Sequence, residues 1–346
     1  MTRCDVTVLG AGIFGLSIAW ACVARGARVR VIDPHGPGAG ASGGVLGALA
    51  PHVPENWNDK KAFQLNSLLR AEIFWPEVEA IGGLGSGYGR LGRLQPLADD
   101  AAVSLARARE ATADALWQGK ATWRVIDAAE AGPWAPPSPT GLLVHDTLTA
   151  RVHPRRACLA LAAALRARGV EIVTDAPPEG AVVHATGAAG LAELSRELGR
   201  SVGAPIKGQA AVLEYNAGTA PQLFAEALHI VPHDDGTVAI GSTSERDFDA
   251  PDTTDSQLEA LIDKGRTLCP ALRNAPVRER WAGLRPRARS RAPMLGPHPF
   301  RPGAFIANGG FKIGFGMAPA IAEVMADLIL TGTDAIPDSF RVEASL

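Results

Sequence analysis

Three glycines and an aspartate near the start of the chain have the spacing of a dinucleotide-binding turn. Gly10, Gly12 and Gly15 follow a short apolar run, and Asp33 comes about 20 residues later. The first glycine makes a tight turn, the second admits the pyrophosphate, and the third lets helix and strand pack closely. An acid at this distance can bind the ribose hydroxyls. The pattern predicts a bound dinucleotide, and its expected contacts are Gly10, Ala11, Gly12, Ile13, Phe14, Gly15, Asp33 and Pro34.

The turn needs a strand before it, and a helix and a second strand after it. Residues 5–9 and 28–33 are rich in β-branched residues and read as buried strands, with a helix over residues 13–24 between them. This βαβ unit predicts a doubly wound parallel sheet. Residues 6–24 carry no charge over a length that could cross a bilayer. Their glycines fit a turn better, so we expect no membrane span and no secretory signal.

Later parts of the chain alternate between similar units and stretches richer in β-structure. We expect strands over residues 92–97, 170–173, 182–187 and 304–308, and a hairpin over 228–243 that turns at Asp235-Gly236. We expect helices over residues 61–81 (kinked at Pro76), 101–116, 154–168, 256–268 and 318–330. The expected fold class is α/β, with a Rossmann-type domain interleaved with an α+β domain built on an antiparallel sheet.

Length and composition limit the function classes. The chain has 346 residues, about two domains' worth, and a formal net charge of −2. This balance argues against broad binding to nucleic acid or to an anionic membrane. Its four cysteines form no C-x-x-C pair and have no zinc-ligand spacing with histidines, so we expect reduced thiols, a cytoplasmic location and no metal site. The oligomeric state stays open.

Several later segments occur in an order that is typical of one enzyme family. They are residues 40–51, 152–156, 205–209, 230–232, 241–243, 281–286, 293–296 and 309–314. This series resembles the FAD-dependent D-amino-acid oxidase superfamily, and most of all its glycine oxidase and sarcosine oxidase branch. The resemblance is vague only over residues 55–140. It implies an FAD-binding domain of residues 1–50, 146–205 and 285–346, and a substrate domain of residues 51–145 and 206–284.

The resemblance also implies which residues contact FAD. The flavin would be lined by Ser42, Gly43, Gly47, Ala48 and Leu49, with a turn from Gly310 to Gly316 at its pyrimidine end. Further expected FAD contacts are Val173, Ala185, Thr186, Gly187, Gly310, Phe311, Lys312, Ile313 and Gly314. Relatives place a β-meander near the adenine, which this chain lacks, so Val173 or Ala176 takes over that contact. No cysteine follows Cys269, so we expect noncovalent FAD.

On the substrate side, Arg285 matches the arginine that grips the substrate carboxylate in glycine oxidases. A planar guanidinium can hold a carboxylate through two parallel hydrogen bonds. His229 falls where glycine oxidases have a tyrosine, and Lys312 replaces an arginine of the family. With Arg285, they are our candidate catalytic residues. The resemblance implies oxidation of the C–N bond of glycine, sarcosine or a D-amino acid by hydride transfer to flavin N5.

Two alternatives stay open. Arg285, Arg287, Arg289 and Arg291 alternate within seven residues and form either a solvated rim or an anion-attracting mouth. A similar flavoenzyme acts on a carboxymethylamino-modified tRNA base, so a nucleic acid substrate is the minority interpretation. Besides a small amine or amino-acid substrate, the enzyme needs an electron acceptor. With oxygen as the acceptor it is an oxidase, and with another acceptor it is a dehydrogenase.

Overall fold

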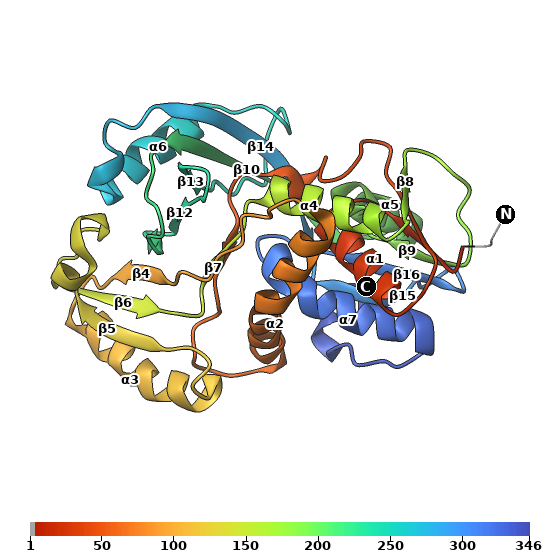
Figure 1. Ribbon diagram of the computed structural model, residues 1–346, viewed down its shortest axis with the longest axis horizontal. Helices are drawn as coiled ribbons and strands as arrows, with labels where there is room; N and C mark the ends of the chain where they lie inside the picture. Colours follow the sequence, from red (N-terminus) through yellow and green to blue (C-terminus); the bar gives the residue numbers. More distant parts are fainter. Residues whose placement is uncertain (1–3) are drawn as a thin grey trace.

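A computed structural model describes residues 4–346, which form two lobes that each contain one large sheet (Figure 1). The six-stranded sheet has the order β15-β16-β9-β1-β2-β8, and all neighbours are parallel except the β15–β16 pair. Its strands are β1 (Val6–Leu9), β2 (Val29–Ile32), β8 (Glu171–Val173), β9 (Ala181–His184), β15 (Met294–Pro297) and β16 (Ala304–Asn308).

The eight-stranded sheet fills the other lobe, in the order β14-β10-β13-β12-β11-β4-β6-β5. Its neighbours are antiparallel except for the parallel pair β4–β11. Its strands are β4 (Arg93–Pro96), β5 (Trp123–Asp127), β6 (Leu142–Asp146), β10 (Gly203–Glu214), β11 (Gln222–Ala225), β12 (Leu228–Pro232), β13 (Thr237–Gly241) and β14 (Val277–Ala288). A small ladder of β3 (Ala48–Leu49) and β7 (Ala150–Arg151) lies between the lobes.

Residues 4–346 contain seven α-helices, which pack on these sheets or on one another. They are α1 (Ile13–Ala24), α2 (Asp59–Gly82), α3 (Asp100–Trp117), α4 (Pro154–Ala167), α5 (Gly187–Leu198), α6 (Ser256–Leu268) and α7 (Gly314–Thr331). Asn58, Asp99 and Asp255 begin α2, α3 and α6 by accepting hydrogen bonds from backbone N–H groups of the first turn. The largest core lies among α1, α2, α4, α7 and the six-stranded sheet, and a second core lies between α6 and the eight-stranded sheet.

Most predicted elements are present. The helices over residues 13–24 and 256–268 have the predicted bounds, the hairpin of β12 and β13 turns between Pro232 and Thr237, and α2 continues through Pro76. All four cysteines are buried and free. The predicted domain boundaries stay a prediction, and the long strands β10 and β14 run across two of them.

The last helix corrects one prediction. It begins at Gly314 instead of residue 318, so the second half of the predicted Gly310–Gly316 turn is helical. The first turn of this helix packs on its neighbours, because Gly314 lies next to Ile13 of α1 and Gly316 lies next to Leu68 of α2. Helix α7 is also long and apolar enough to cross a membrane, but half of this apolar stretch is buried, and α7 packs against α1 and α2 as a core helix.

Candidate active site

The glycine-rich turn between β1 and α1 is built for close backbone approach. Gly10 has a φ of +104°, and a β-carbon there would overlap the carbonyl of Ala185. A β-carbon on Gly15 would overlap the carbonyl of Gly10. Asp33 braces the turn, because its Oδ2 accepts from Ala11 N at 2.7 Å and its Oδ1 accepts from His35 N at 2.9 Å. The carboxylate of Asp33, which is predicted to bind the ribose, therefore lies next to the glycine-rich turn.

The segment after β2 returns to the same helix terminus. Ser42 Oγ accepts from Ile13 N at 3.0 Å, so this hydroxyl lies where the first free N–H groups of α1 would meet a phosphate. Gly43 and Gly47 have no room for a β-carbon, because one would overlap the carbonyl of Gly38 and the other that of Val152. Ala48 and Leu49 follow as β3. Of the five residues predicted to line the flavin, Ser42 therefore contacts the glycine-rich turn, and Gly47, Ala48 and Leu49 lie next to β7 and Val152.

The remaining predicted cofactor residues lie along the same sheet edge. Val173 ends β8, and its carbonyl accepts from Asp33 N at 3.0 Å, next to the expected ribose position. Ala185 N donates to Leu9 O at 2.8 Å, and Thr186 and Gly187 begin α5. Residues 174–180 contain no strand, in keeping with the predicted loss of the meander. Of the two candidates for the adenine contact, Val173 is half-buried in the strand and Ala176 lies in this loop.

The loop before α7 joins the cofactor turn to the eight-stranded sheet. A β-carbon on Gly310 would lie 2.8 Å from the ring of Phe14 in α1. Phe311 N donates to Pro286 O at 3.0 Å, one residue after Arg285 in β14. Ile313 and Gly314 then begin α7. The loop therefore contacts the first turn of α1 on one side and the strand that carries Arg285 on the other.

Arg285 is buried, and the fold makes space for its guanidinium. The side chain is 9% exposed, and its Nη1 donates to Thr243 O at 3.2 Å. The guanidinium lies over Gly208 of β10, where a β-carbon would overlap it. Burial lowers the pKa of Arg285 to about 10, against the opposing charge of Glu245. The group is still a cation at neutral pH, and most of its donors have no protein partner among the described residues.

The other two candidate substrate residues lie near Arg285. Lys312 is exposed, and desolvation followed by the charge of Arg285 lowers its pKa. His229 is half-buried, its Nδ1 has no hydrogen-bond partner among the described residues, and its ring lies 4.5 Å from that of Phe224. Burial and then the charges of Arg93 and Lys312 lower the pKa of His229 to about 3. The imidazole is thus neutral at neutral pH, and both cations are close enough to disfavour its protonation.

Sequence reasoning missed two groups around this cluster. Arg93 and Asp146 form a buried ion pair at 3.0 Å, and Arg93 lies near enough to His229 to affect its pKa. Glu245 accepts from Gln209 Nε2 at 3.0 Å and from the hydroxyl of Thr243, the residue whose carbonyl holds Arg285. Arg93 is far from Asp146 in the sequence, and Gln209 is far from Glu245, so only the tertiary structure brings these partners together.

The alternating arginines after Arg285 do not form one surface. Arg287 is half-buried, with its guanidinium 5.9 Å from the centre of the Phe311 ring. Arg289 and Arg291 are exposed, and Arg291 lies in a turn with a φ of +60° beyond the end of β14. Arg285 and Arg287 therefore lie in β14 beside the loop of Phe311, whereas Arg289 and Arg291 lie beyond the end of that strand.

Known proteins are similar to this chain over nearly its whole length. The sequence profile of the family described as FAD dependent oxidoreductase matches residues 5–328. A glycine oxidase of Bacillus licheniformis is 26% identical, over 95% of this chain and 93% of its own length. The bifunctional protein ThiO/ThiG of Nostoc sp. is 28% identical over 95% of this chain, which spans about half of that longer protein (53%).

Solved structures show the same fold. The glycine oxidase of Geobacillus kaustophilus superposes with a TM-score of 0.83 at 22% identity, covering 99% of both chains. The iminodiacetate oxidase of Chelativorans sp. superposes with a TM-score of 0.82 at 24% identity, covering 97% of this chain and 98% of its own.

Proposed function

Because this chain belongs to the FAD dependent oxidoreductase family, we propose that it oxidises the C–N bond of a small amino acid or secondary amine. The chain is an enzyme and FAD is its cofactor; the proposal concerns the substrate. The observation that carries it is the buried guanidinium of Arg285, next to the loop that joins the cofactor turn to the substrate sheet. A buried cation with free donors requires an anionic partner, and a carboxylate fits it in shape and charge.

The residues around Arg285 suit a small carboxylate with an amine beside it. Arg285 would hold the carboxylate through two hydrogen bonds and so fix the α-carbon. Lys312 adds a second positive charge, and the neutral His229 offers a ring nitrogen to a polar substrate group. When bound, FAD supplies the acceptor for the hydride that leaves the α-carbon. The amine lone pair completes the C=N bond, its proton leaves to solvent, and water hydrolyses the imine.

This proposal assigns orientation to the protein and no general base. Glu245, the buried carboxylate whose charge acts on Arg285, already accepts from Gln209 and Thr243 and lies beside Lys207 at 3.5 Å. It is therefore engaged in holding Thr243 in place, and through it Arg285. The substrate amine would react in its neutral form.

The experiment is anaerobic mixing of the purified yellow protein with glycine, sarcosine, D-amino acids and iminodiacetate. We expect at least one of them to bleach the flavin absorbance, and Arg285→Ala to lose this bleaching. Arg289→Ala is the matched control, because Arg289 is an exposed arginine at the end of the same strand. Bleaching that is unchanged in Arg285→Ala rejects the carboxylate clamp, and no bleaching by any member rejects the substrate class.

Two finer points follow from the same experiment. Fast reoxidation by air after bleaching identifies an oxidase, and slow reoxidation identifies a dehydrogenase with another acceptor. If only tRNA that carries a carboxymethylamino group bleaches the flavin, with binding that weakens steeply as salt rises, the minority interpretation replaces the small substrate.

A further inference from the structure

Two histidines and an aspartate meet between the lobes, away from the candidate active site. His153 precedes the first residue of α4, whereas His233 and Asp235 lie in the turn between β12 and β13. One ring nitrogen of each imidazole and one carboxylate oxygen lie within 4.8 Å of one another. The two rings are 4.7 Å apart between centres. We propose that these three residues bind a divalent transition metal ion of the Zn²⁺ type, which links α4 to the hairpin.

Buried nitrogens without partners are the observation that points to a ligand. His233 is 1% exposed, and its Nδ1 lies 3.2 Å from Thr237 Oγ1. Its Nε2 is buried and has no hydrogen-bond partner, and the same is true of Nδ1 of His153. A buried polar group left unpaired costs about 1–3 kcal/mol. A metal ion bound by the cluster would give one ring nitrogen of each histidine a partner, whereas no protein group within the described residues partners these two unpaired nitrogens.

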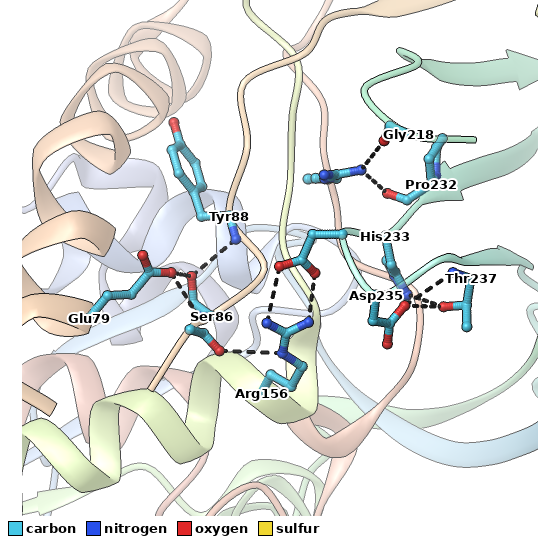
Figure 2. A network of polar contacts seen from close by, with 12 residues as sticks. Glu79, Ser86, Tyr88, Arg156, Gly218, Pro232, His233, Asp235 and Thr237 are labelled. Atoms are coloured by element: carbon cyan, nitrogen blue, oxygen red, sulfur yellow. Dashed lines mark hydrogen bonds and ion pairs between the residues drawn. The ribbon is translucent and has the colours of Figure 1, made fainter. Parts of the chain in front are cut away.

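The carboxylate is held in place for the same role. Figure 2 shows Asp235 beside His233 and Thr237. Asp235 Oδ1 accepts from Thr237 Oγ1 at 2.6 Å, and the second oxygen has no hydrogen-bond partner among residues 4–346. A tetrahedral zinc ion would place its ligand atoms roughly 3.4 Å apart. Side-chain movements of about 1 Å therefore complete the site, and a water molecule can take the fourth position because Asp235 is exposed.

The surrounding charges leave the site near neutral. Arg156 is paired with Asp234, at 2.6 Å between Nη1 and Oδ1 (Figure 2), and Arg151 donates to Pro232 O at 2.8 Å. Arg155, the third cation near His153, is paired with Glu279 at 2.7 Å. Burial lowers the pKa of both imidazoles, which keeps them neutral and free to bind a metal. Two imidazoles and a carboxylate form a ligand set that suits zinc.

Such an ion would connect the two halves of the molecule. Helix α4 packs against α1 and against residues Ala41–Gly43, which include the predicted flavin contacts Ser42 and Gly43. Strand β12 carries His229 of the candidate substrate site. The ion would thus fix the hairpin against the cofactor-binding half without touching either ligand. Because no metal takes part in the proposed oxidation, the two proposals can fail independently.

The test uses the FAD-loaded protein, treated with EDTA, desalted and titrated with Zn²⁺ in a calorimeter. We expect one Zn²⁺ per chain, and binding at least about 100-fold weaker in His233→Gln, because losing a direct ligand costs more than losing an outer-shell partner. His35→Gln is the control, since His35 is exposed and far from the turn in sequence, and should bind Zn²⁺ like the wild type.

A second variant guards against misfolding. Asp235 is exposed in the turn, and Asp235→Asn keeps an oxygen that accepts from Thr237. We therefore expect this variant to fold normally and to bind Zn²⁺ more weakly. In thermal unfolding, Zn²⁺ should raise Tm of the wild type and of His35→Gln by more than it raises Tm of His233→Gln or Asp235→Asn, since an ion that binds the folded state stabilises it. Wild-type protein that takes up no Zn²⁺, or His233→Gln and Asp235→Asn that bind it as tightly as wild type, would overturn the proposal.

Discussion

The guanidinium of Arg285 lies over the backbone of Gly208, so closely that any β-carbon at position 208 would overlap it. The two residues are on neighbouring strands, β10 and β14, in a ladder that pairs Ile206 with Arg285 and Gly208 with Gly283. Because Gly208 has no side chain, β10 leaves space in which the guanidinium of Arg285, the proposed binding group for the substrate carboxylate, is buried.

Gly208→Ala should displace Arg285 and raise KM for a carboxylate substrate at least about 10-fold, or about 1.4 kcal/mol of binding free energy. FAD content should stay unchanged, because Gly208 is not among the proposed FAD contacts. Steady-state kinetics and flavin absorbance measure both quantities. Gly85→Ala is the control, because its β-carbon would lie 3.1 Å from Nη2 of Arg156, another arginine but outside the site. An unchanged KM in Gly208→Ala would show that Arg285 does not bind the substrate.

Gly15→Ala should prevent stable FAD binding. The added β-carbon would overlap the carbonyl of Gly10, so α1 must move away from β1 and the glycine-rich turn must open. The measured quantity is FAD per chain after gel filtration, with the melting temperature. Gly40→Ala is the comparison, because a β-carbon there meets no atom within 4 Å. If the two variants retain FAD equally, the packing role of Gly15 is refuted.

Replacements of Asp33 should weaken FAD binding in a graded way. Asp33→Ala removes the acceptor for Ala11 N and His35 N together with the proposed ribose ligand, whereas Asp33→Asn keeps one amide oxygen. Hydrogen bonds to a charged group contribute about 1.5–3 kcal/mol. We expect Kd for FAD to rise at least about 10-fold in Asp33→Ala and by less in Asp33→Asn. Quenching of flavin fluorescence gives both values, and equal affinities would contradict the assignment.

The pH dependence of folding should carry the signature of His229. Its folded-state pKa is about 3, below the usual value of 6.5. Below pH 6.5 the unfolded chain therefore binds the proton more readily, and stability falls as pH falls from 6.5 toward 3. In His229→Gln this decline should be shallower, as measured by urea unfolding at several pH values. Since His229 in the folded protein has a pKa of about 3, it is already neutral at pH 5, and kcat/KM should show no His229 titration between pH 5 and 8.

Removing one partner of the buried ion pair Arg93–Asp146 should lower the free energy of unfolding more than replacing both partners with apolar residues. Asp146→Asn keeps an acceptor for Thr149 N but leaves Arg93 as an unpaired buried cation. We expect a loss of about 3 kcal/mol in the free energy of unfolding. The double variant Arg93→Met/Asp146→Leu should lose less, because no buried charge remains. If the double variant loses as much free energy of unfolding as Arg93→Met and Asp146→Leu lose together as single variants, the two residues are not coupled.

The amino-acid sequence alone determined the local elements and the cofactor. Gly10, Gly15 and Asp33 indicated a dinucleotide because this turn is built from residues close together in the chain, where backbone geometry and spacing carry the signal. The ordered segments that resemble amino-acid oxidases then indicated FAD, and the family match confirmed it. The long strands β10 and β14 escaped prediction because they lack regular alternation and contain Gly208 and Pro286.

Only the tertiary structure decided which side chains meet. Arg285 is separated from Gly208 and Glu245 by dozens of residues, yet the pairing of β10 with β14 brings all three together. His153 and His233 come from different lobes, and their spacing in the chain has no metal-site pattern. Such contacts depend on strand register and on the burial of particular atoms. Neither can be read from local composition, because each depends on parts of the chain that are distant in sequence.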